Sequence, residues 1–225
     1  MMAPRQTTRA RKVVGEGRRA LVDAARSLFT TRPYDQVTTA QIAEKADVAY
    51  GLITHHFVNK RGLYQAVLDE IAAEIAQHQL APAPQGASLV DRLRHSMRSH
   101  ITHVDGYADS FVAFVRGNIG VDPDQQSALD TLRWQGAQWL LLMVGITEPL
   151  PPALRAGMHG WVGHLDELMI DRITHGDLDI DTIVELATAA LVTTLRTAAR
   201  LDPSITFAPE VLRELDAFDV ATRPR

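Results

Sequence analysis

The sequence contains no cysteine, and that absence excludes several kinds of chemistry. A chain without thiols forms no disulfide, holds no metal through thiolate ligands and has no cysteine nucleophile. A cytoplasmic location is therefore favoured over a secreted one. Long apolar runs are missing as well: the longest, residues 139–146, is too short to cross a bilayer, and no apolar stretch follows the basic N-terminus as in a signal peptide. We therefore expect no membrane partner.

Acidic residues are scarce in the first third of the chain, although the net charge of the whole chain is −4. Residues 1–65 hold eleven lysines and arginines against five acidic residues, whereas residues 66–225 hold twelve against twenty-two. Because phosphate neutralisation needs clustered cations rather than overall basicity, this asymmetry indicates a localised surface for a polyanion. A merely solvated basic tail would explain residues 1–12 but not the rest.

Sustained alternation of apolar and polar residues, the pattern of a half-buried strand, is also absent. Apolar residues instead recur at helical spacing almost throughout, so we predict an all-α protein. Beyond residue 80, the predicted helices cover residues 89–103, 107–118, 123–146, 152–174 and 180–201, with a short one after Pro209.

Three short helices are predicted between Arg18 and Phe57. The second begins at the capping-box spacing of Thr38 and Gln41, and residues 46–49 separate it from the third by a length suited to a helix-turn-helix corner. The apolar residues expected inside this corner are Ile42, Ala43, Val48, Ile53 and Phe57.

The start of the third helix would then present a small, polar face to solvent. The residues on this face are Ala49, Tyr50, Gly51, Thr54 and His55. In a helix-turn-helix, residues at this place meet base edges in the major groove of DNA. Lys60 begins the following helix, after the expected N-cap Asn59, where backbone N–H groups and the helix dipole attract phosphate.

Four blocks of residues, taken together, resemble the tetracycline-repressor-like (TetR) family of transcriptional regulators. The blocks are residues 24–29 (AARSLF) with Tyr34, 38–43 (TTAQIA), 48–51 (VAYG) and 56–63 (HFVNKRGL). The resemblance implies a three-helix DNA-binding domain with a fourth, connecting helix, and a larger helical C-terminal domain that dimerises and usually binds an effector. With the proline- and glycine-rich stretch 81–86, it predicts a flexible basic arm (1–14), a DNA-binding domain (15–80) and an effector-binding and dimerisation domain (81–225).

The resemblance also implies roles for individual residues. Thr39 and Lys60 would bind phosphates, Tyr50, Gly51, Thr54 and His55 would lie at or near bases, and His56 would pack or touch phosphate. The predicted DNA-binding set is Thr38, Thr39, Ala49, Tyr50, Gly51, Thr54, His55, His56 and Lys60. The arginines expected to reach the DNA backbone or a minor groove, or simply to aid solubility, are Arg5, Arg9, Arg11, Arg18 and Arg19.

Two positions depart from the family pattern. Asp47 stands where glycine is usual in the turn, and aspartate tolerates a left-handed backbone better than most residues. Thr54 stands where tyrosine is usual, which removes a large phenolic phosphate contact that Tyr50 would partly replace. We therefore expect the turn to survive and the operator preference to differ.

The C-terminal half carries wide apolar helix faces but few specific motifs. By resemblance, the last two long helices would form a four-helix bundle with a second copy, through Met158, Trp161, Leu165, Leu168, Leu191 and Leu195. Gly157, Gly160 and Gly163 weaken the first of these helices, which close helix–helix approach would explain. Pockets are mostly apolar with a few polar groups, and the candidates for lining an effector pocket are His103, Arg116, Trp134, Trp139, Met143 and His164.

Histidines near Asp105 and Trp161, among them His100, make a metal-responsive site conceivable, but the sequence shows no clear multidentate cluster, so we predict neither a metal nor a cofactor. The predicted function is a dimeric transcriptional regulator, a repressor released from a palindromic double-stranded DNA operator by a small-molecule effector. Two alternatives remain open. One is a helical small-molecule-binding protein or enzyme without sequence-specific DNA binding, although no catalytic motif supports an enzyme; the other is a nonspecific DNA-compacting protein.

Overall fold

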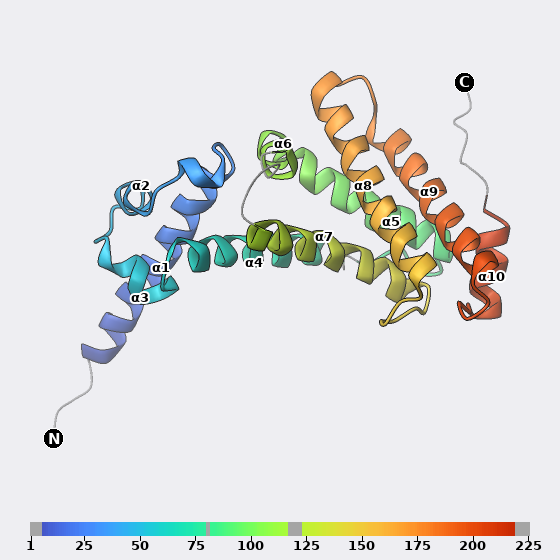
Figure 1. Ribbon diagram of the computed structural model, residues 1–225, viewed down its shortest axis with the longest axis horizontal. Coiled ribbons are helices and arrows are strands. Elements are labelled where there is room, and N and C mark those ends of the chain that lie inside the picture. The colour runs from blue at the N-terminus through green and yellow to red at the C-terminus, as the bar shows by residue number, and fades with distance from the viewer. Residues whose placement is uncertain (1–5, 80–81, 117–122, 219–225) are drawn as a thin grey trace. The chain divides into compact units, whose positions relative to one another are not determined.

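The computed structural model describes residues 6–79, 82–116 and 123–218, and within these ranges all regular structure is helical (Figure 1). The helices of the first half are α1 (Gln6–Phe29), the short 3-10 helix η1 (Tyr34–Gln36), α2 (Thr39–Lys45), α3 (Gly51–Phe57) and α4 (Lys60–Gln79). Those of the second half are α5 (Leu89–Asp105), α6 (Ala108–Arg116), α7 (Pro123–Met143), α8 (Pro152–His175), α9 (Ile180–Leu201) and α10 (Pro209–Asp216). The predicted fold class is therefore confirmed.

Most predicted helix ends lie within two or three residues of the observed ones. The largest internal difference is at α1, which begins at Gln6, so residues 6–14 of the predicted flexible arm are helical. Arg5 lies outside the described residues, as do the last two residues of the predicted helix 107–118. Residues 6–14 contain no proline or glycine, so no helix-breaking residue interrupts the helix there.

The structure divides the chain differently from the predicted domain boundary. One compact unit comprises residues 1–71 and 109–129, and the other comprises residues 72–108 and 130–225. The proline- and glycine-rich stretch ends α4 and leads into α5 within the second unit, rather than separating two domains. Such residues interrupt a helix, and a helix interruption is not by itself a domain boundary.

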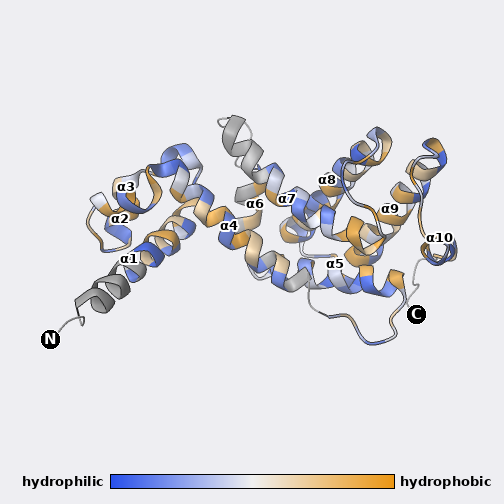
Figure 2. Ribbon diagram, turned by 90° about the horizontal axis from the view of Figure 1, so that it is seen from below, coloured by the Kyte–Doolittle hydropathy of each residue, from blue (hydrophilic) through white to orange (hydrophobic). Residues whose placement is uncertain are grey.

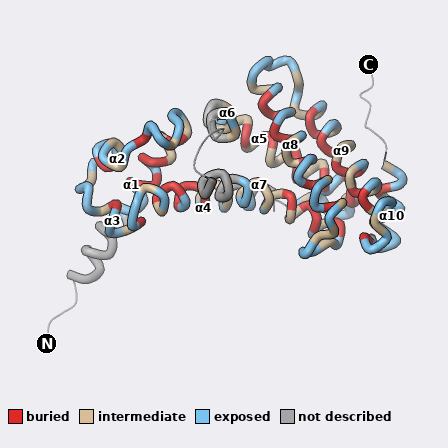
Figure 3. The backbone as a smooth tube through the Cα atoms, in the orientation of Figure 1, coloured by how far each residue is buried: buried red, intermediate tan, exposed pale blue. Residues whose placement is uncertain are grey.

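In the second unit, α9 packs against α5 and α8, and α10 packs against α5 and α9. Buried residues line the contacting faces of α5, α8 and α9 (Figure 3), and hydrophobic residues recur along these helices (Figure 2). α9 is long and apolar enough to cross a membrane by length and composition, but its residues Ile183, Val184, Ala187 and Leu191 are buried inside this unit. We therefore interpret α9 as a core helix.

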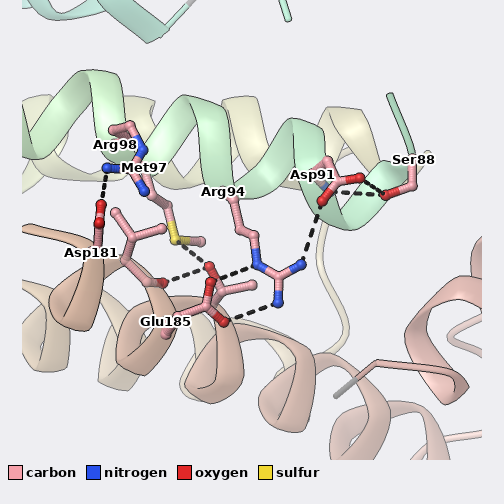
Figure 4. A network of polar contacts seen from close by, with 9 residues as sticks. Ser88, Asp91, Arg94, Met97, Arg98, Asp181 and Glu185 are labelled. Carbon is pink, nitrogen blue, oxygen red and sulfur yellow. Dashed lines mark hydrogen bonds and ion pairs between the residues drawn. The ribbon is translucent and has the colours of Figure 1, made fainter. Parts of the chain in front are cut away.

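A row of polar contacts runs beside this core between α5 and α9 (Figure 4). The guanidinium of Arg94 donates through Nε and Nη2 to the two carboxylate oxygens of Glu185, at 2.7 and 2.9 Å. Arg98 pairs with Asp181 in the same row. Between the two helices, the buried Thr188 hydroxyl donates to the Val184 carbonyl at 2.7 Å and contacts the Met97 sulfur at 3.4 Å. These contacts fix the register of α5 on α9.

Candidate nucleic-acid interface

The core of the predicted helix-turn-helix lies inside the first unit. Ile42 and Ala43 of α2 and Ile53 and Phe57 of α3 are buried, as predicted, while Val48 is half-buried. α1 packs against both α2 and α3 through its own buried stripe. α2 and α3 have only seven residues each, too short to be stable alone, so this packing maintains them.

The turn between α2 and α3 has the backbone conformation that the sequence predicted. Asp47 lies at φ 53°, in the left-handed region, and the N–H of Val48 donates to the carbonyl of Ala43 at 3.1 Å. An aspartate therefore occupies the position where the resembled family usually has glycine. The chain reverses there without losing the hydrogen bond that closes the end of α2.

Thr38 forms the predicted capping box. Its hydroxyl oxygen accepts from the Gln41 N–H at 3.2 Å, and its own N–H donates to Gln41 Oε1 at 2.9 Å. These two hydrogen bonds satisfy backbone groups at the start of α2. In this structure Thr38, which we included in the DNA-binding set, is an N-cap.

The predicted outward face of α3 is exposed to solvent. Ala49, Gly51, Thr54 and His55 are all exposed, and 59% of Tyr50 is accessible. Tyr50 is the residue before the first turn of α3, and its phenolic oxygen lies 3.2 Å from the hydroxyl oxygen of Thr39 on α2. The structure thus brings together a residue predicted to contact phosphate and one predicted to lie near bases.

Lys60, predicted to contact phosphate, is held by Tyr34. Its ammonium donates to the Tyr34 carbonyl at 2.5 Å and lies 3.9 Å from the centre of the Tyr34 ring, a cation–π contact. Burial lowers the pKa of Lys60, and the nearby carboxylate of Asp35 opposes that shift. This contact could not be predicted from sequence patterns, because Tyr34 and Lys60 are 26 positions apart in the chain.

The Lys60 contact belongs to an aromatic cluster that joins α1, η1 and α4. The Phe29 ring stacks on Tyr34 at 5.4 Å between centroids, and Tyr64 meets both rings edge-on, at 4.9 and 5.0 Å. Aromatic pairs in this geometry stabilise beyond the area they bury. The cluster therefore fixes the start of α4 against α1.

His56 is half-buried, as the packing alternative for this residue predicted. Its Nε2 atom is buried, and no hydrogen bond to it is found within the described structure. Burial lowers the pKa of His56, and the nearby His55 and Arg18 lower it further. Arg18 also lies over the Phe57 ring, 5.2 Å from its centre. Arg18 and Arg19 are exposed, and Arg9 and Arg11 lie in the first turns of α1.

α3 and α4 are joined by only Val58 and Asn59. Val58 has φ 68° and ψ −49°, and the N–H of Asn59 donates to the Phe57 carbonyl at 2.7 Å, which makes a γ-turn of the rare, strained hand. The Asn59 side chain caps α4, as predicted, by accepting from the Gly62 N–H at 2.9 Å. Gly62 has to be glycine, because a Cβ there would lie 2.1 Å from the Phe57 carbonyl oxygen.

The candidate pocket residues are divided between the two units. Arg116 belongs to the first unit, while His103, Trp134, Trp139, Met143 and His164 belong to the second, where His164 is exposed. Trp134 stacks on His159, 4.2 Å between centroids, and donates to Glu148 at 2.8 Å. The buried Nε1 of Trp139 has no partner among the described residues. Within this part of the chain no three metal-binding side chains cluster.

The prediction for the dimer interface needs correction. Met158, Trp161 and Leu165 on α8 and Leu191 and Leu195 on α9 are buried within the chain itself, and Leu168 is half-buried. Trp161 donates its indole N–H to the Ala187 carbonyl at 2.9 Å, inside this packing. The apolar faces of α8 and α9 are wide enough to contact both the core of their own chain and a second copy. The large apolar side chains predicted for the interface lie in the core instead.

The first unit thus carries an exposed helix-turn-helix, and the second unit contains long packed helices. Residues 21–67 match the family model described as bacterial regulatory proteins, tetR family. The chain is also 34% identical over 74 residues to the HTH-type transcriptional regulator BetI of Escherichia coli (strain K12 / DH10B), a match that covers 32% of this chain and 38% of BetI. It therefore spans about two fifths of the length of the curated relatives it matches.

Solved structures extend the likeness of fold to most of the chain. A tetR-family transcriptional regulator from Streptomyces coelicolor has a TM-score of 0.65 and 23% identity, over 90% of this chain and 89% of its own. The regulator FadR from Bacillus subtilis, solved with stearoyl-CoA, has a TM-score of 0.58 and 17% identity, over 78% of this chain and 96% of its own. Residues 21–67 are thus similar to a family of bacterial transcriptional regulators, and the helical fold of most of the chain is similar to that of solved regulators.

Proposed function

We propose that this protein is a cytoplasmic, homodimeric repressor that binds a palindromic double-stranded DNA operator and is released from it by a small-molecule effector. The observation that carries the proposal is the exposed, polar face of α3 on a helix-turn-helix whose apolar side is buried. In such a corner the second helix enters the major groove and the first crosses the backbone. Gly51, Thr54 and His55 are then placed to meet base edges.

The operator would be a palindrome because a two-fold dimer presents two recognition helices about 34 Å apart, one helical turn of DNA. Two small residues on α8, the exposed Gly160 and the half-buried Gly163, support a dimer through that helix. Among the described residues, no atom beyond the local turn of helix comes within 4 Å of a Cβ built on Gly160 or Gly163, whereas one built on Gly157 would meet Thr194 of α9 at 2.8 Å. Gly157 thus allows α9 to approach within the chain, and Gly160 and Gly163 leave room for a helix of a second copy.

The effector would bind within the second unit and change the fit of the two recognition helices to the grooves. Two features there support a polar ligand contact: the ion pair of Arg133 with the buried Asp166, and the indole nitrogen of Trp139, which has no hydrogen-bond partner within the described ranges. Burial raises the pKa of Asp166, and Arg133 opposes that shift. Because the FadR neighbour was solved with stearoyl-CoA, long-chain acyl-CoA is the first class to screen.

The test is selection of bound sequences from a random duplex pool at fixed salt, comparing the wild type with Thr54→Ala/His55→Ala. The control is Gln65→Ala/Asp69→Ala, which changes two exposed residues of α4 that bond each other at 2.9 Å. We expect the wild type and the control to enrich one palindrome, and the α3 variant to lose it. Weak, salt-sensitive binding without enrichment would instead favour the nonspecific alternative, and no binding would favour a small-molecule-binding protein.

A further inference from the structure

Two exposed hydroxyl groups from different elements lie together on the helix-turn-helix. Thr39 Oγ1 is on the first residue of α2, Tyr50 Oη is on the residue that precedes α3, and the two oxygens are 3.2 Å apart. Eleven positions separate the residues, so the contact is produced by the corner and not by local sequence. Tyr50 nevertheless keeps 59% of its surface accessible.

The chemistry of the pair suits an anion. Each hydroxyl has one proton to donate and two lone pairs to accept with. When one hydroxyl donates to the other, the second still has a proton to give to an oxygen outside the protein. A phosphate oxygen accepts such bonds strongly, because hydrogen bonds to a charged acceptor are roughly twice as strong as those between neutral groups.

The position of the pair indicates which part of DNA it meets. In a helix-turn-helix the first helix crosses the phosphate backbone and only the second lies in the groove. The Tyr50 hydroxyl lies beside α2, the first of these helices, rather than over the exposed face of α3. This position favours a phosphate rather than a base edge as the partner of the phenol.

We propose that Thr39 and Tyr50 act as one phosphate-binding pair, so that Tyr50 contributes affinity and positioning but not base preference. The base-reading residues are then Gly51, Thr54 and His55 alone. This inference rests on the proposed DNA-binding function and changes the role of Tyr50 within it. Thr39 has a second role, because its hydroxyl holds the phenol in place before DNA arrives.

The test uses two variants that each remove one hydroxyl and little else, Tyr50→Phe and Thr39→Val, and their combination. Affinity is measured for the selected operator and for a scrambled duplex across a range of salt concentrations, and sequence preference is measured by selection. We expect Tyr50→Phe to weaken both duplexes by the same factor, roughly 3- to 10-fold. The selected palindrome should stay unchanged. The salt slope should stay unchanged as well, because no charge is removed.

The double variant distinguishes a pair from two separate contacts. If the hydroxyls act together, Tyr50→Phe/Thr39→Val loses less affinity than the product of the two single losses. Loss confined to the operator, with altered preference at one base pair, would show that Tyr50 reads a base and would overturn the proposal. Unchanged affinity in Tyr50→Phe would overturn it too. Absence of DNA binding by the wild type would instead refute the proposed function itself.

Discussion

A Cβ atom at position 62 would lie 2.1 Å from the carbonyl oxygen of Phe57, so the first turn of α4 meets the last turn of α3 directly. That oxygen also accepts the N–H of Asn59 at 2.7 Å and cannot move without opening the γ-turn. We therefore expect Gly62→Ala to lower the free energy of unfolding by about 1–3 kcal/mol, the usual cost of overpacking.

Urea unfolding followed by circular dichroism measures the effect of Gly62→Ala. The matched control is Gly51→Ala, because Gly51 is also a helical glycine, is exposed, and a Cβ there meets no described atom within 4 Å. The control should be neutral or gain up to about 1 kcal/mol from the better helix propensity of alanine. Equal stability of the two variants would contradict the contact with Phe57.

The Arg94–Glu185 pair joins α5 to α9 through two hydrogen bonds, and both side chains are mostly buried (Figure 4). Arg94→Met leaves the carboxylate without this partner and should cost about 1–3 kcal/mol of stability. The double variant Arg94→Met/Glu185→Leu should cost less than the sum of the single variants, because it removes the mostly buried carboxylate together with its partner. Arg98→Met, which removes the more exposed pair with Asp181, should cost less than about 1 kcal/mol. Additive losses from Arg94 and Glu185 would show that the two do not act as a pair.

His100 on α5 makes stability depend on pH. Burial lowers its pKa to about 4, with a smaller contribution from His103, so the folded protein keeps the ring neutral while the unfolded chain protonates it near 6.5. Above pH 6.5 the lowered pKa of His100 costs no stability. As the pH falls from 6.5 towards 4, it lowers the free energy of unfolding by up to about 3 kcal/mol. Denaturant midpoints of His100→Leu should therefore fall less than those of the wild type between these pH values. His164→Gln, at an exposed position of α8, is the control, and an unchanged pH profile in His100→Leu would exclude this source.

The proposed dimer contact can be tested at Gly160. Gly160 is exposed, and no atom of the described residues lies within 4 Å of a Cβ built there, so we expect Gly160→Leu to fold and yet to collide with a helix of the second copy. We expect the dimer dissociation constant to rise roughly 10- to 100-fold, as measured by analytical ultracentrifugation. Gly51→Leu is the matched control, since it places the same side chain at an exposed glycine of α3. An unaffected dimer in Gly160→Leu would place the interface elsewhere.

The features predicted best from the sequence depend on neighbouring residues. The Thr38–Gln41 capping box, the Asn59 cap and the left-handed Asp47 each follow from chemistry within four positions along the chain. The buried corner residues followed from helical spacing over two short helices. Local rules determine these features, so they can be predicted without knowing which helices meet.

The features that were missed depend on partners distant in the sequence. Nothing near Lys60 indicates that its ammonium bonds to Tyr34, 26 positions away. The apolar stripes of α8 and α9 revealed how much surface each helix buries but not against which helix, so core residues such as Trp161 and Leu191 were predicted as an interface. Likewise, polar residues on several helices could not be assigned to one pocket without their arrangement in space.

The link of Val58 and Asn59 has a mechanical consequence. A hinge needs residues whose backbone angles are free to change, and here one residue is fixed in a γ-turn and the other caps α4 through its side chain. The C-terminal end of α3 therefore cannot rotate independently, and it moves together with the first turn of α4. If α3 reads DNA as proposed, we expect its adjustment to half-sites of different spacing to involve the first turn of α4 as well as α3 itself.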